Sequence, residues 1–96
     1  MSKNIYIVYK DKDIAVFDFE QYENMAIEES FMIEDREYKL IAVLGEKGAC
    51  SLIIKHNGKM VYATITEVTQ IGIPNVTLFF LIAKDEYLQI GFHFTS

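Results

Sequence analysis

The chain has 96 residues, a formal net charge of −5 at pH 7, 51% hydrophobic residues and 14% aromatic residues. This length and composition are typical of one folded domain spanning residues 1–96, and they argue against a disordered chain. A sequence pI near 4.9 also argues against nucleic acid as a partner, because binding to phosphates needs a basic surface.

The cysteine content and the hydrophobic runs indicate a compartment. Cys50 is the single cysteine, so no internal disulfide can form, whereas small secreted domains usually depend on several. The first residues, MSKNIYIVYKDKD, contain no apolar segment of the kind that a signal peptide needs. The longest apolar run, Leu78–Ala83, is far shorter than the ~20 residues that cross a bilayer. We therefore expect a cytoplasmic protein without a membrane partner.

Strand patterns begin at the start of the chain. Asn4–Lys10 and Ile14–Phe19 are rich in β-branched and aromatic residues, and the charged DKD at 11–13 separates them. Two such runs around a short polar turn predict a β-hairpin.

The segment DFEQYENMAIEE departs from the strand pattern. Asp18 is placed to cap a helix, and Phe19, Tyr22 and Ala26 recur at the spacing of one helical face. Early glutamates also suit the positive end of a helix. The pattern favours one short helix near residues 19–29, with an acidic strand or loop as the alternative.

The middle of the chain predicts two further hairpins. Phe31–Ile33 and Tyr38–Leu44 flank the polar EDRE. Ala49–His56 and Lys59–Val68 are joined by Asn57-Gly58, the dipeptide that best accommodates a type I′ turn because both central residues need positive φ.

The last two strands differ in their patterns. Val76–Ala83 is apolar on both faces, which predicts a central strand. In Tyr87–Phe94 the apolar residues alternate, which predicts one core-facing side. That side carries Leu88, Ile90, Phe92 and Phe94. About 7–8 short strands joined by tight turns indicate a mainly β fold, either an antiparallel sandwich or a small barrel.

Residues that could support catalysis or bind a metal are few. Cys50 and His56 lie six residues apart, which on one strand separates them by about 20 Å at 3.3 Å per residue. Pairing of Cys50 with His93 has no motif behind it, and the two histidines lack ligand spacing. We expect Cys50 to be a core residue, and we expect no enzyme activity, no metal site and no cofactor.

Residues 18–37 contain eight acidic residues and one basic residue, a local balance of −7, so the rest of the chain sums to +2. One interpretation is a solvated coat that keeps the protein soluble. The other is a docking surface, because concentrated like charges repel and a basic partner would neutralise them and associate faster. The candidate residues, with Tyr22 as a buried anchor, are Glu20, Tyr22, Glu23, Glu28, Glu29, Glu34, Asp35 and Glu37.

A short, acidic, mostly β chain that carries EQYENMAIEESFMIEDRE and no catalytic set resembles the immunity proteins of bacterial toxin–immunity systems, such as those of contact-dependent growth inhibition. The resemblance implies a non-catalytic protein that binds one cognate toxin, often a basic nuclease, and blocks its active cleft. It transfers no individual residue, because no motif is shared. A small-ligand-binding β-barrel or an enzyme with an apolar interior is the alternative. Homo-oligomerisation through an exposed strand edge is a third possibility.

Overall fold

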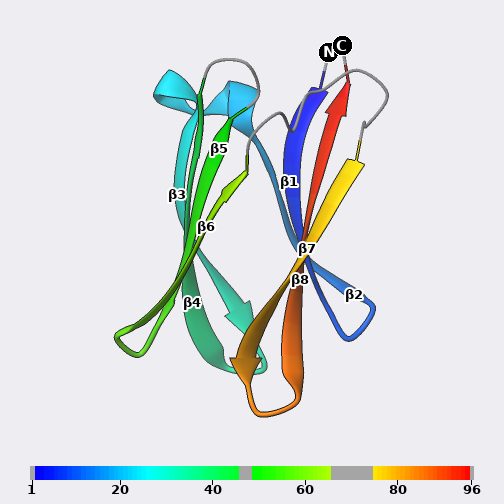
Figure 1. The fold of residues 1–96 in the computed structure, drawn as a ribbon, viewed down its shortest axis with the longest axis vertical. Coiled ribbons are helices and arrows are strands. Elements are labelled where there is room, and N and C mark those ends of the chain that lie inside the picture. Colours follow the sequence, from blue (N-terminus) through cyan, green and yellow to red (C-terminus); the bar gives the residue numbers. More distant parts are fainter. Residues whose placement is uncertain (1, 46–48, 66–74, 96) are drawn as a thin grey trace.

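The computed structural model describes residues 2–45, 49–65 and 75–95. They form two antiparallel sheets of four strands each, packed face to face (Figure 1). Sheet A has the order β2-β1-β8-β7, and sheet B has the order β3-β4-β5-β6. The strands are β1 (Ser2–Tyr9), β2 (Lys12–Asp18), β3 (Ala26–Ile33), β4 (Arg36–Leu44), β5 (Cys50–His56), β6 (Lys59–Ile65), β7 (Asn75–Ala83) and β8 (Glu86–Thr95).

The fold is therefore the sandwich of the two predicted alternatives, and across the described ranges the sheets do not close into a barrel. Sheet B is a meander of consecutive strands, whereas sheet A joins the first hairpin of the chain to the last through the pairing of β1 with β8. None of the described residues forms a helix with the length and hydrophobicity needed to cross a bilayer.

Each sheet contains two hairpins that close through two-residue turns. Both central residues have positive φ in Lys10-Asp11 (49° and 62°), Glu34-Asp35 (47° and 66°) and Asn57-Gly58 (48° and 77°). This is the conformation of the type I′ turn, whose twist matches that of paired strands. The predicted Asn-Gly hairpin is thus confirmed. The four hairpin turns lie toward one end of the sandwich, here called the hairpin end, and the connection from β2 to β3 crosses between the sheets at the other, the crossover end (Figure 1).

Alternating residues of both sheets fill the core. In β8, Leu88, Ile90 and Phe92 are fully buried, as the alternation predicts, while Phe94 lies outside the described side chains. Tyr38 and Leu40 of β4 bury the facing side of sheet B. These side chains occupy the space between the two sheets.

The predicted short helix near residues 19–29 is reduced to two single 3₁₀ turns, η1 (Phe19–Gln21) and η2 (Glu23–Met25). Asp18 caps the first turn, because its carboxylate accepts a hydrogen bond from the Glu20 backbone N–H at 2.9 Å. Asn24 and Met25 then have φ values of 57° and 51°, which end any right-handed helix. β3 begins directly afterwards at Ala26.

The prediction that Val76–Ala83 forms a central strand is wrong. β7 lies at the edge of sheet A, next to β8. Its inward residue Phe80 is buried, but the outward residues Phe79 and Leu81 are 65% and 55% exposed. The outer side of β7 is therefore apolar although it is exposed.

A close contact marks the outer face of sheet A. Gly91 of β8 is the register partner of Tyr6 of β1, and the tyrosine ring lies against its Cα. A Cβ atom at position 91 would overlap the ring atoms Cε2 and Cζ. Glycine is therefore required here by the neighbouring ring and not by its own backbone conformation.

Candidate functional site

The structure divides the acidic segment into separate groups. Glu20 and Glu23 lie in the 3₁₀ turns at the crossover end, whereas Glu34 and Asp35 form the β3–β4 turn at the hairpin end. The eight-residue strand β3 runs between them, a length of about 26 Å at 3.3 Å per residue. The eight candidate residues therefore do not form one contiguous surface.

The acidic residues of the hairpin end meet basic residues from distant parts of the chain. Glu34 lies 4.0 Å from Lys10 and 4.0 Å from Arg36. Arg36 in turn contacts Glu86 of sheet A at 3.3 Å, which links the two sheets. Asp35 and Glu37 are exposed beside these pairs. Lys10 and Arg36 thus compensate Glu34 and Glu86, whereas Asp35 and Glu37 form no ion pair among the described residues.

Glu28, in the middle of β3, is also compensated. Its carboxylate lies 2.6 Å from the Lys39 ammonium on the outer face of sheet B. The hydrogen bond from Lys39 is the main reason that the pKa of Glu28 lies below its usual value. Lys55 is the register partner of Lys39, so this face carries both signs of charge.

The remaining carboxylates lie close to Tyr22 in the chain, in the 3₁₀ turns and the adjoining strands, and Glu29 interacts with Tyr22. We call Asp18, Glu20, Glu23 and Glu29, together with Tyr22, the acidic ledge. Glu20 and Glu23 are exposed, and neither forms an ion pair with any residue that the structure describes. Tyr22 is half-buried against the core. Burial, followed by the charge of Glu29 and a hydrogen bond to it, raises the pKa of Tyr22. Glu20 and Glu23 are therefore uncompensated, and Tyr22, next to Glu23 in the chain, is positioned by the core and by Glu29.

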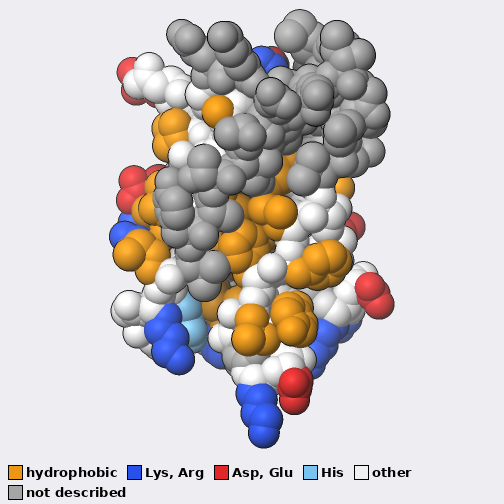
Figure 2. Space-filling view, in the orientation of Figure 1, with side chains coloured by type: hydrophobic (Ala, Val, Ile, Leu, Met, Phe, Trp, Pro, Cys, Tyr) orange, Lys and Arg blue, Asp and Glu red, His pale blue; other side chains and the backbone are white. Residues whose placement is uncertain are grey.

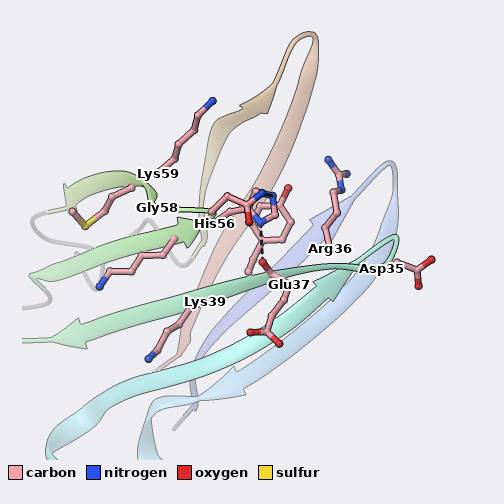
Figure 3. A pocket seen from close by; sticks show the side chains of 11 residues that line it. Asp35, Arg36, Glu37, Lys39, His56, Gly58 and Lys59 are labelled. Carbon is pink, nitrogen blue, oxygen red and sulfur yellow. Dashed lines mark hydrogen bonds between the residues drawn. The ribbon is translucent and has the colours of Figure 1, made fainter.

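A groove of about 710 Å³ opens at the hairpin end of sheet B (Figure 3). It runs between the β3–β4 and β5–β6 turns, and its charged residues are Asp35, Arg36, Glu37, Lys39, Lys55 and Lys59, with His56 beside them. Lys39 and Lys59 point away from each other (Figure 3). The groove is open and mixed in charge, and its side chains do not converge on one ligand position.

His56 has a structural role in this groove. Its Nδ1 lies 2.8 Å from the Glu37 carbonyl oxygen, which can only accept, so Nδ1 donates (Figure 3). The imidazole also stacks on Tyr38 with ring centroids 4.2 Å apart. Sequence reasoning found no signal for this cluster, because Glu37 and His56 are distant along the chain.

Cys50 is placed as a core residue. It is buried, and burial raises the pKa of its thiol to about 12, so the thiolate is not formed at neutral pH. His56 lies at the other end of β5, as the spacing predicts. His93 lies on the outward side of β8 in the other sheet, so Cys50 and His93 do not share a face. Within the described ranges no three His, Cys, Asp or Glu residues could hold a metal ion together.

Comparison with known proteins finds no matching family model, no matching curated protein and no matching solved structure. Function is therefore inferred from the chain's own residues.

Proposed function

We propose that this protein is a non-catalytic binding protein that docks a basic protein against its acidic ledge and blocks it, as immunity proteins block their toxins. The observation that carries the proposal is the position of Glu20 and Glu23: both are exposed, and neither has an ion-pair partner among the described residues. The hairpin end differs, because Lys10 and Arg36 lie close to Glu34 and because Lys39, Lys55 and Lys59 line the groove beside Asp35 and Glu37.

Electrostatics favours a partner for the ledge. Like charges held close together raise the free energy of the folded state, and a cationic surface removes that cost on binding. Exposed carboxylates also steer an oppositely charged protein toward the site. Tyr22 adds an aromatic ring whose position is already fixed by the core and by Glu29, so little conformational entropy is lost when a partner packs on it.

The class of partner follows from its required chemistry. A toxin domain that cleaves nucleic acid must present lysine and arginine to phosphates, and an acidic protein can occupy the same cleft. A basic toxin or nuclease domain is therefore the partner that we propose. Because its one cysteine is buried and unpaired, the protein suits a reducing compartment, and we propose that it acts in a bacterial cytoplasm.

Two double variants test the ledge with equal changes in charge. Glu20→Gln/Glu23→Gln removes two carboxylates from the ledge, and Glu34→Gln/Asp35→Asn removes two from the hairpin end. The wild-type protein is immobilised to capture partners from a native bacterial lysate, and association with the captured protein is then measured at low and high salt. The ledge variant should associate roughly tenfold more slowly at low salt and lose most of its salt dependence.

The hairpin-end variant is the control and should keep the wild-type rate. Equal rates for both variants, or a loss confined to the hairpin-end variant, would contradict docking at the ledge. If the captured protein is a nuclease, its activity should fall to background at a one-to-one ratio with the wild type. Undiminished nuclease activity in the saturated complex would refute inhibition while leaving binding intact.

A further inference from the structure

The outer side of β7 and β8 exposes three large hydrophobic side chains. Phe79, Leu81 and Tyr87 are 65%, 55% and 57% exposed, respectively. Leu81 and Tyr87 are register partners, so they lie side by side across the two strands. Figure 2 shows hydrophobic side chains gathered on this part of the molecule. This surface lies on sheet A at the edge opposite β2, the strand that leads into the acidic ledge.

The strand at this edge lacks the usual protection against pairing. β7 bonds to β8 on one side, and among the described residues no strand pairs with its other side. Its sequence, NVTLFFLIA, contains neither a charged residue nor proline, and the one irregularity lies near its end, between Leu81 and Ala83. Isolated edges normally carry lysine, proline or bulges that prevent pairing with another chain. The other edge strands of the sandwich carry charges, such as Lys12 in β2 and Glu28 in β3.

We infer that β7 pairs antiparallel with β7 of a second copy, so that two A sheets join into one sheet of eight strands. Two identical strands in antiparallel contact are related by a two-fold axis, and each then presents the same surface to the other. Paired residues of a sheet project to the same face. Phe79 and Leu81 of both copies would therefore form one continuous apolar stripe.

Charge and pattern both fit a second copy. Each chain carries −5, yet no like charges face each other along a strand without charged residues. The pairing also accounts for the absence of charged residues and proline from β7, because an edge that pairs with a second copy needs no protection. In the dimer β7 becomes a central strand of the joined sheet, whereas in one copy it is an edge.

The available area limits the strength of the dimer. With ~200 Å² for each large side chain, the exposed fractions of Phe79, Leu81 and Tyr87 amount to about 350 Å² per copy. Edge pairing covers only part of this outer face, so two copies bury less than about 700 Å² of these side chains before the strand edges are added, which is below the ~1,200 Å² of stable interfaces and fits a weak, transient dimer. We therefore expect a weak dimer that forms only at high protein concentration and dissociates on dilution.

The test compares two lysine substitutions on the same face of sheet A. Phe79→Lys places like charges across the proposed seam. Val16→Lys is the matched control, because Val16 is 62% exposed and faces outward from β2 at the far edge. Light scattering and sedimentation velocity are measured over a concentration series. The wild type and Val16→Lys should move from 11.1 kDa toward twice that mass, and Phe79→Lys should remain at 11.1 kDa.

Hydrogen exchange locates the contact. Amides of β7 should gain protection with concentration in the wild type and in Val16→Lys, and not in Phe79→Lys. Because both side chains are exposed, circular dichroism should show that both variants are folded. Any of three results would overturn the inference. The wild type could stay monomeric, Phe79→Lys could dimerise like the wild type, or Val16→Lys could lose the dimer as Phe79→Lys does.

Discussion

Replacing Gly91 by alanine places a methyl group against the Tyr6 ring on the outer face of sheet A. The new Cβ would overlap Cε2 and Cζ of the ring and lie 2.6 Å from its hydroxyl oxygen. Atoms cannot remain at such separations, so the ring must rotate away from β8. Tyr6 is half-buried, so it has room to move toward solvent, at the loss of its contact with the neighbouring strand.

Two opposing effects set the magnitude. Inserting a methyl group into a filled space costs about 1–3 kcal/mol. Alanine in a strand is otherwise favoured over glycine by about 0.5–1 kcal/mol, because glycine loses more backbone freedom on folding. Gly91→Ala should therefore destabilise the wild type by about 1–2 kcal/mol. In a Tyr6→Ala background the overlap is gone, and the same substitution should stabilise the protein by about 0.5–1 kcal/mol.

A double-mutant cycle measures this reversal of sign. The free energy of unfolding of the four proteins is obtained from urea denaturation followed by circular dichroism, at the lowest usable protein concentration so that self-association does not contribute. The coupling energy should exceed the ~0.5 kcal/mol scatter expected of independent sites. Equal costs of Gly91→Ala in both backgrounds would refute the contact between the ring and Gly91.

Three further predictions concern single side chains. Burial raises the pKa of Cys50 to about 12, so iodoacetamide at mildly alkaline pH should label this thiol only as fast as the protein unfolds. Mass spectrometry of a labelling time course checks this rate, and rapid labelling of the folded protein would contradict the prediction. The Tyr38 hydroxyl is buried and has no hydrogen-bond partner among the described residues. Tyr38→Phe should therefore leave the free energy of unfolding unchanged or raise it by about 1 kcal/mol, as measured by thermal unfolding. A clear loss of stability would show that the hydroxyl does form a hydrogen bond. Lys39 lowers the pKa of Glu28, so this pair stabilises the protein above the unfolded-state pKa of Glu28 and the contribution is lost as pH falls through the lower folded-state value. An NMR titration should place the midpoint of Glu28 below 4.5 in the wild type and closer to 4.5 in Lys39→Met, and an unchanged midpoint would exclude the pair.

Much of the fold was predictable from local patterns. Alternation places Leu88 and Ile90 in the core, and Asn57-Gly58 marks a hairpin, because both signals depend on residues close together in the chain. The start of β3 was missed, since Ala26 also falls on the helical face of Phe19 and Tyr22. The positive φ values of Asn24 and Met25 decide against that helix, and no residue type there requires them.

The candidate site was predictable only in part. Charge density along the sequence identified residues 18–37, but it carries no information on which acidic residues meet a base. Lys10 reaches Glu34 and Glu86 reaches Arg36 only because hairpins from different sheets share one end. The edge position of β7 was equally hidden, because a strand's neighbours depend on the order of distant strands.

The pairing of β1 with β8 has a consequence for the order of folding. Sheet B is built from strands that follow one another in sequence, so its hairpins close short loops and are all synthesised before β7 and β8. Ile5 and Phe92 are fully buried register partners of β1 and β8. They must meet across nearly the whole length of the chain. Such contacts are slow to form because a long loop loses entropy on closing. Ile5→Val should therefore increase the unfolding rate and leave the refolding rate nearly unchanged. Slower refolding would show that β1 and β8 pair early in folding.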